Sequence, residues 1–273
     1  MKILILYSSG LDSFIMKKLA ESQGHDVSCV YYQHGAPSEK EEIKLLPDNV
    51  EIRNIDWLNE TRIPVAKKSN PAVGPIYIPG RNMIFALLAA CQDLPDEIWL
   101  GPLVDEANDL ATDKNETFRV MTNSLMNYVL SPFKDKITLR FPFVERGWGK
   151  VECVQWALCN GITREEILST VSCSFHDGTK ACGECFQCLK RRLVFKKCGV
   201  DICESYTDPL TNDFGTKTME NILKQAETSN DPDIQNMKQL IYNHRYPKQI
   251  HTGAAPAVMQ GEIKLNSDFI YWH

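Results

Sequence analysis

The chain has 273 residues, of which 43% are hydrophobic and 24% are charged, proportions that are typical of a globular protein with a sizeable core. Its formal net charge of −5 argues against broad electrostatic binding to nucleic acid or to an anionic membrane. The first apolar run ends at Leu6, which is too short for a signal peptide or a membrane span, so we expect a cytoplasmic protein.

Short apolar runs alternate with amphipathic segments along the first part of the chain. Strands are expected at 2–7, 26–32, 50–55, 97–100 and 137–141, and helices at 12–23, 39–46, 82–91, 117–130 and 149–160. Thr163 is expected to cap a further helix, because Glu166 follows three residues later. The alternation predicts an α/β domain over residues 1–170, with a parallel sheet flanked by helices.

The rest of the chain divides into a cysteine-rich segment, 171–200, and a C-terminal extension, 201–273. The extension is polar, and only one helix is expected in it, near 217–226. Lys190, Arg191 and Arg192 are expected on the solvated face of a helix that follows the cysteines, with binding of a substrate phosphate as the alternative.

The stretch "YSSGLDS", Tyr7 to Ser13, joins the first strand to the first helix. A helix N-terminus and a group of backbone amides attract an anion, and three serine hydroxyls add donors. Gly10 is expected to supply a positive φ and close approach of a ligand. No lysine ends the loop, so it is not a Walker A sequence. The pattern predicts a phosphate site, and the alternative is a serine-rich turn capped by Asp12.

Four cysteines lie close together in the sequence "CSFHDGTKACGECFQC". Cys173, Cys182, Cys185 and Cys188 have the spacing C-x8-C-x2-C-x2-C. Four thiolates from one short segment can enclose Zn²⁺ as a structural site, although an iron–sulfur cluster also uses four thiolates. His176 is a competing ligand. We therefore predict a metal site, with zinc preferred.

The loop resembles a known family signature. Ser8-Ser9-Gly10-Leu11-Asp12-Ser13 is similar to the SGGxDS motif of the PP-loop ATP pyrophosphatases, with serine in place of one glycine. The resemblance implies that ATP and Mg²⁺ bind here and that AMP is transferred to an acceptor oxygen while pyrophosphate leaves. The β- and γ-phosphates would contact Ser8, Gly10, Asp12 and Ser13, and the wider nucleotide set includes Tyr7, Ser9 and Leu11.

The combination of this loop with the cysteine spacing resembles the 7-cyano-7-deazaguanine synthase (QueC) family. "YIPGRNMIFALLAA" and "GWGKVECVQWAL" are similar to two further family segments, and the resemblance covers roughly residues 1–200. It implies an adenine nucleotide α-hydrolase-like fold in which Arg81, Asn82, Gly101 and Lys150 contact the nucleotide. The implied catalytic residues are Asp12, Ser13, Arg81 and Lys150.

One segment departs from the family. The family has a GxNxxDYSGYPDCR-like sequence after its fourth strand, whereas this chain reads "GPLVDEANDLATDKNETF". Asp113 and Phe118 are the candidate substrate contacts in this segment, because they can stand at the aspartate and the phenylalanine of the family sequence. Divergent relatives occur in phage and in bacterial defence operons, and the extension after residue 200 fits such a member.

The resemblance implies ATP-dependent conversion of 7-carboxy-7-deazaguanine and ammonia to 7-cyano-7-deazaguanine by a homodimer. One alternative is a related enzyme that stops at the amide or joins the acid to another amine, such as a protein terminus, in antiviral defence. Modification of tRNA is a second alternative, which the net charge disfavours. A non-catalytic nucleotide-binding subunit is a third.

Overall fold

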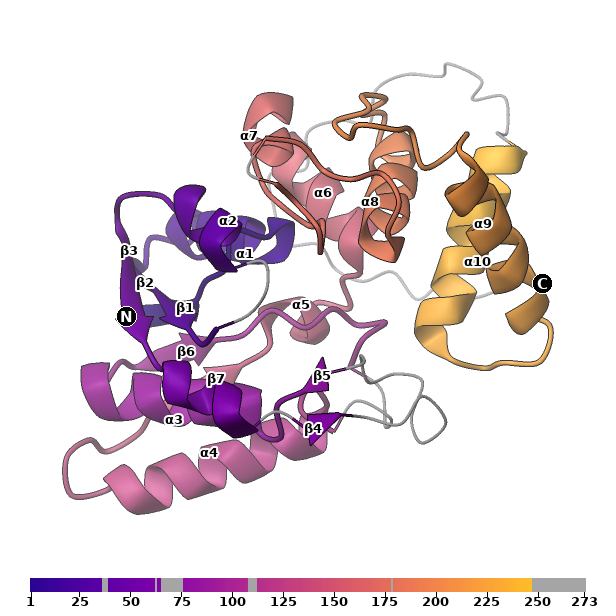
Figure 1. Cartoon of the computed structure of the whole chain (residues 1–273). Helices are drawn as coiled ribbons and strands as arrows, with labels where there is room; N and C mark the ends of the chain where they lie inside the picture. The colour runs from indigo at the N-terminus through magenta and orange to yellow at the C-terminus, as the bar shows by residue number, and fades with distance from the viewer. Residues whose placement is uncertain (36–38, 62, 65–75, 108–111, 178, 247–273) are drawn as a thin grey trace, which may run out of the picture.

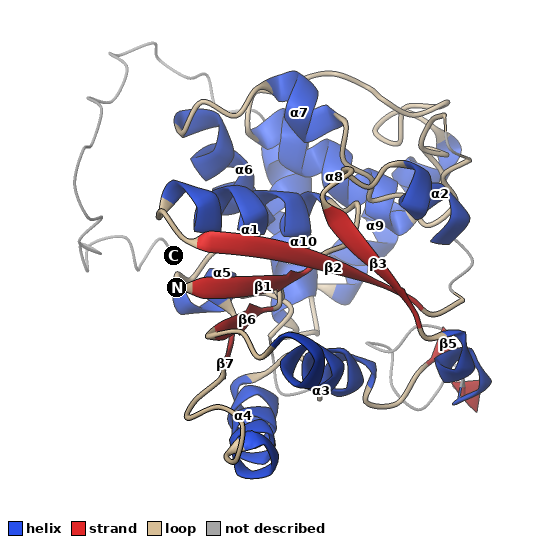
Figure 2. Ribbon diagram, turned by 90° about the vertical axis from the view of Figure 1, so that its left-hand side faces the viewer, coloured by secondary structure: helices blue, strands red, loops and turns tan. Residues whose placement is uncertain are grey.

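A five-stranded parallel sheet is the centre of the molecule, in the order β3-β2-β1-β6-β7 (Figures 1 and 2). The computed structural model describes residues 1–35, 39–61, 63–64, 76–107, 112–177 and 179–246. The strands are β1 (Lys2–Leu6), β2 (Asp26–Gln33), β3 (Val50–Asn54), β6 (Glu97–Trp99) and β7 (Thr138–Arg140). Because the order reverses direction at β1, the carboxyl ends of β1 and β6 border a crevice, which is where open α/β sheets bind ligands.

Strand β1 is buried on both faces, so its successive side chains enter two different cores. Ile3 and Ile5 pack with α1 (Leu11–Ser22), α6 (Lys150–Cys159) and α8 (Phe186–Lys197). Leu4 and Leu6 pack with α3 (Arg81–Asp93) and α4 (Glu116–Leu130). Figure 2 shows these two groups of helices on opposite sides of the sheet. Such double burial explains why the strand is a continuous apolar run rather than an alternating one.

The remaining elements are short or lie in the last third of the chain. They are α2 (Glu39–Lys44), a 3₁₀ helix (Asp56–Thr61), the antiparallel pair β4 (Ile63–Pro64) and β5 (Ile76–Tyr77), α5 (Pro142–Glu145), α7 (Arg164–Leu168), α9 (Asp213–Gln225) and α10 (Pro232–Arg245). Helices α9 and α10 pack against α8 and contribute to the same core as α1 (Figure 1). No described helix has the length and apolar character needed to cross a bilayer.

The predicted α/β architecture is confirmed, and the capping box at Thr163 and Glu166 is present. The description of the extension as irregular apart from one helix is wrong, because α10 follows α9. Only Met237, Leu240 and Ile241 of α10 are buried, a stripe too narrow to stand out in a polar sequence. The part of the extension after residue 246 lies outside the described residues.

Two further expectations are wrong. Lys190 and Arg191 are not on a solvated face, since they are only 3% and 5% exposed and bind carboxylates. Gly10 has φ −76°, so it needs no positive φ. A Cβ at Gly10 would lie 3.1 Å from the Ser8 hydroxyl, so close packing explains the glycine better than backbone conformation does.

Candidate functional site: a cavity at the end of the first strand

The predicted phosphate loop lies at the carboxyl end of β1 and borders a cavity of about 320 Å³. Helix α1 begins at Leu11, directly after the loop, so its N-terminus is at the same place. The predicted site residues that line the cavity are Ser8, Gly10, Leu11, Asp12, Ser13, Arg81, Asn82, Gly101 and Lys150. The structure therefore brings together residues that the sequence separates by about 140 positions.

Ser13 holds the loop in shape. Its hydroxyl is hydrogen bonded to the carbonyl oxygen of Ser8, lies 3.0 Å from that of Gly10, and accepts from the backbone N–H of Ser8 at 3.2 Å. The neighbouring backbone N–H of Val171 donates to the carbonyl oxygen of Ser9 at 2.8 Å. These bonds fix the loop to itself and to the segment that precedes the cysteines, so the loop is preorganised.

Lys150 and Asp12 form an ion pair at the cavity wall. Lys150 is the first residue of α6 and is 7% exposed, and its Nζ lies 3.1 Å from Asp12 Oδ2. A cation at a helix N-terminus opposes the helix dipole, and Asp12 compensates for it. Asp12 Oδ1 is buried and has no hydrogen-bond partner among the described residues. The pair therefore offers a cation for an anionic ligand and a carboxylate oxygen for a metal ion.

Arg81 and Asn82 enter the cavity from the start of α3. Gly80 precedes them with φ 68°, a left-handed conformation that favours glycine. Asn82 Nδ2 donates to the carboxylate of Asp113 at 3.0 Å, which fixes the amide. Arg81 forms no ion pair with any described residue. Its guanidinium is thus a second cation at the cavity besides Lys150. Unlike Lys150, it is not neutralised by any described carboxylate.

Sequence analysis missed several residues that line the cavity. Glu106 and Lys114 lie in the segment that departs from the family, and their side chains pair at 3.5 Å. Burial raises the pKa of Glu106, but the positive charges of Lys114, Lys150 and Lys190 lower it by a larger amount. The net pKa is therefore below the ordinary value. Gln187, Val171 and Ser172 also line the cavity. Their sequences are polar or irregular and show no motif that would have pointed to them.

Four predicted contacts lie elsewhere and line neither this cavity nor a second one found in the described residues. Tyr7 is buried, and the Ser9 hydroxyl donates to the carbonyl oxygen of Glu42 at 2.6 Å. Asp113 holds Asn82, and the ring of Phe118 stacks on Phe141 at a centroid distance of 6.4 Å. Their roles as ligand contacts stay predictions.

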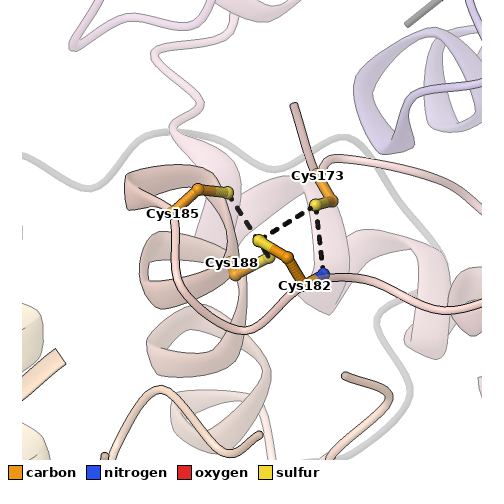
Figure 3. A group of neighbouring side chains, drawn as sticks. All are labelled: Cys173, Cys182, Cys185 and Cys188. Carbon is orange, nitrogen blue, oxygen red and sulfur yellow. Dashed lines mark hydrogen bonds between the residues drawn. The ribbon is translucent and has the colours of Figure 1, made fainter. Parts of the chain in front are cut away.

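The four predicted metal ligands converge in space (Figure 3). The sulfur atoms of Cys173, Cys182, Cys185 and Cys188 all lie within 4.8 Å of one another. The Sγ–Sγ distance is 3.5 Å from Cys173 to Cys182, 3.9 Å from Cys182 to Cys188 and 3.5 Å from Cys185 to Cys188. Zinc–sulfur bonds of about 2.3 Å in a tetrahedron place the sulfur atoms about 3.8 Å apart. The residues therefore fit one tetrahedral ion such as Zn²⁺, with all four positions filled by cysteine.

The backbone supports this cluster. The N–H groups of Phe175 and Cys182 donate to Cys173 Sγ, each at 3.3 Å. Gly183 has φ 76°, and a Cβ there would lie 2.0 Å from the carbonyl oxygen of Thr207. Only glycine fits this turn, which connects the cluster to the C-terminal extension. The cluster thus has the geometry of a closed structural metal site at the start of α8.

Comparison with known proteins identifies the family. The family model "Queuosine biosynthesis protein QueC" matches residues 2–199. A 7-cyano-7-deazaguanine synthase of Nitratiruptor sp. is 28% identical over 73% of this chain and 96% of its own length. Proteins of the same name from Nautilia profundicola and Cellvibrio japonicus are 25% and 26% identical, again over 73% of this chain and over 96% and 95% of their own lengths. On the strength of the match over residues 2–199, the chain belongs to the QueC family.

Proposed function

We propose that this chain is an ATP-dependent enzyme that converts 7-carboxy-7-deazaguanine and ammonia to 7-cyano-7-deazaguanine. The observation that carries the proposal is the cavity in which the Ser8–Ser13 loop meets Arg81 and Lys150. Its loop amides, helix N-terminus and cations suit a polyphosphate. The names of the relatives supply the product, and membership of the QueC family makes it the first substrate class to test.

The proposed reaction has three balanced steps. A carboxylate oxygen of the acid attacks the α-phosphorus of ATP, the bond from that phosphorus to the bridging oxygen breaks, and pyrophosphate leaves with the electron pair. Ammonia then attacks the acyl carbon, AMP leaves and a proton is lost, which gives the amide. The amide oxygen attacks a second ATP in the same way, pyrophosphate leaves, and loss of AMP and of both protons from nitrogen gives the nitrile.

The side chains at the cavity supply charge and position rather than covalent catalysis. Lys150 and Arg81 would stabilise negative charge on the phosphates as pyrophosphate leaves. Asp12 Oδ1, which is buried without a partner among the described residues, is the kind of oxygen that binds Mg²⁺. When bound, Mg²⁺ neutralises phosphate charge. Ser13 would act by holding the loop amides in place for the nucleotide.

The metal cluster has a different role in this proposal. Zinc held by four cysteines has no open position for substrate or water, so it supplies folding stability rather than chemistry. The cluster begins α8, and Gln187 on that helix lines the nucleotide cavity. Zinc would therefore position one wall of the site.

Product analysis tests the proposal. The protein is incubated with ATP, Mg²⁺, 7-carboxy-7-deazaguanine and ammonium, and products are identified by mass spectrometry while pyrophosphate is measured. We expect the nitrile with two pyrophosphates released per molecule. The variant Lys134→Met, which removes a partly buried cation outside the cavity, should retain this activity. No acid-dependent pyrophosphate release would refute the proposal.

A second candidate follows from residues 201–246, which lie beyond the family match yet help to form a second cavity. In this candidate, the adenylated acid stops at the amide or is joined to another amine, for example a protein terminus. The same incubation distinguishes it, because the amide would accumulate without nitrile, or pyrophosphate release would need a protein amine instead of ammonium. A homodimer is likewise proposed, and light scattering of the purified chain tests it.

A further inference from the structure

Helix α10 lies beyond residues 2–199, where the family match ends, and it packs against α8 (Figure 1). Two of its side chains reach toward the segment that departs from the family sequence. Asn236 Nδ2 donates to Asp105 Oδ2 at 2.8 Å. Asp233 Oδ1 accepts from Lys190 Nζ at 2.7 Å. The extension is therefore in contact with the part of the chain in which the family resemblance is weakest.

Lys190 on α8 connects the extension to this segment. Its Nζ lies 2.7 Å from Asp233, 3.4 Å from Asp105 and 4.0 Å from Glu106. The Lys190 and Asp105 side chains are both buried, and separating buried charges from their partners is costly. Helix α10 thus holds Lys190 in place, and Lys190 in turn holds the two adjacent carboxylates.

Asp105 and Glu106 belong to one tight turn. The backbone N–H groups of Glu106 and Ala107 both donate to the carbonyl oxygen of Leu103, each at 3.0 Å. Because the turn is closed by these bonds, its two acidic residues move together. A displacement of Asp105 at α10 would therefore also displace Glu106, which lines the cavity at the end of β1.

Glu106 brings a negative charge to this cavity. The lysines around it keep its pKa below the ordinary value, so it is ionised at neutral pH. Its nearest cations are Lys114 at 3.5 Å and Lys190 at 4.0 Å, which are longer distances than a normal hydrogen bond, so its oxygens can still accept from a ligand. An ionised carboxylate repels phosphate and accepts from N–H groups. Glu106 therefore suits a ligand with N–H donors rather than the polyphosphate.

We propose that α10 positions Glu106 to bind the acid that is adenylated, so that Asp233 and Asn236 are positioning residues for the reaction. The inference rests on the proposed function. The acid of that reaction has a guanine-like ring, in which a ring N–H and an amino group are neighbouring donors that one carboxylate can accept together. Glu106 binds this edge of the ring and repels the carboxylate of the acid, which is left for Arg81 and Lys150.

The test changes α10 and follows each substrate separately. Asp233→Ala and Asn236→Ala are compared with Gln239→Ala, at an exposed position of the same helix whose amide contacts Asn243. KM for 7-carboxy-7-deazaguanine is measured by pyrophosphate release, and ATP affinity by calorimetry without the acid. We expect the first two variants to raise KM for the acid about fivefold or more, with kcat and ATP affinity within about twofold of the unaltered chain. Gln239→Ala should change none of the three.

A double variant tests whether α10 acts through Glu106. Glu106→Ala removes the carboxylate and should raise KM for the acid by itself. Adding Asp233→Ala should then raise KM by less than about twofold more, because both changes act on one contact. Asp233→Asn, which keeps the shape of the side chain and loses its charge, takes the place of Asp233→Ala if thermal unfolding shows that the latter does not fold.

The outcomes separate the two proposals. If the unaltered chain releases no acid-dependent pyrophosphate, the proposed function and this inference both fail. If it does, and the changes at Asp233 and Asn236 leave KM for the acid unaltered or lower kcat alone, α10 has a purely structural role and only this inference is overturned. It is also overturned if KM rises equally with and without Glu106, or if ATP affinity falls as much as KM for the acid rises.

Discussion

Two buried lysines, Lys150 and Lys190, lie in regions with opposite charge balance. Lys150 borders the cavity at the end of β1 and contacts one carboxylate, that of Asp12, at 3.1 Å. Lys190 lies on α8, with Asp233 at 2.7 Å, Asp105 at 3.4 Å and Glu106 at 4.0 Å. Carboxylates outnumber the cation around Lys190 and do not around Lys150. Lys190 is therefore more than neutralised within the fold, whereas Lys150 is balanced by a single carboxylate.

The pKa of Lys190 reflects this balance. Burial lowers this pKa, but the negative charges of Asp105, Asp233 and Glu106 raise it by a larger amount. The net pKa is therefore above the ordinary value. Asn236 on α10 donates to Asp105 at 2.8 Å, which gives the network a second link to the extension. Burial alone thus does not identify a functional lysine, because the number of carboxylate partners decides whether its charge is available.

Metal removal should have the largest effect and should separate the two regions. Chelation would remove the Zn²⁺ proposed at the four cysteines near the start of α8, and structural zinc sites contribute folding energy directly. We expect hydrogen exchange to show lost protection in α8 and in α10, which packs on it, while β1 and α1 stay protected. Readdition of Zn²⁺ is the control. Uniform loss across the sheet would contradict the separation of the regions.

Lys190→Met should destabilise the fold. It leaves Asp105 and Asp233 without their shared cation, and breaking a buried ion pair in this way costs about 3–5 kcal/mol. Urea unfolding measures the loss. Lys134→Met removes the partly buried partner of the exposed Asp96 and should cost no more than about 1 kcal/mol. Equal unfolding midpoints for the two variants would show that the buried network contributes no special stability.

Lys150→Met should reduce catalysis with little loss of stability. Removing one preorganised charge from a site of developing negative charge costs about 10²–10³ in kcat. Asp12 is partly exposed, so water can solvate it when Lys150 is absent. Pyrophosphate release and urea unfolding are measured together. A variant that unfolds as readily as Lys190→Met, or that keeps full activity, would remove the distinction between the two lysines.

Glu106→Gln should have the smallest effect, a loss of stability that is present at neutral pH and disappears in acid. The pKa of Glu106 is below its ordinary value, so the folded chain binds fewer protons there than the unfolded chain does. Its contribution to stability is present above the ordinary pKa of about 4.3 and is lost as pH falls through the folded value. Urea unfolding from about pH 7 to pH 3 should therefore show a shallower acid decline than in the unaltered chain.

Glu165→Gln, at an exposed position in α7, is the control for this comparison, because it removes a carboxylate that is distant from the lysines in sequence and open to solvent. An acid decline that is the same in Glu106→Gln and in the unaltered chain would mean that Lys150 and Lys190 do not act on Glu106.

Sequence patterns were enough for the sheet, for the place of the loop between β1 and α1, and for the grouping of the four cysteines. Each depends on interactions that are local or strictly periodic: the apolar run at Ile3–Leu6, the serines around Gly10, and four thiols within one short segment. The cavity could be predicted in part, because Arg81 and Lys150 start helices where a cation needs a compensating anion. The positions of Glu106, Lys114 and Gln187 at the cavity could not be predicted, because no sequence spacing relates these residues to the loop.

The amino-acid sequence by itself determined that β1 is buried on both faces, that a helix follows a loop rich in hydrogen-bond donors, and that four cysteines can enclose one ion. Tertiary structure alone decided which charged side chains are buried and which carboxylates neutralise them. Lys190 and Arg191 have the composition of a solvated helix, yet Asp233, 43 residues further on, and Glu204, 13 residues further on, neutralise them in the interior. Charge balance depends on which distant carboxylates fold against a cation, and local sequence does not encode that contact.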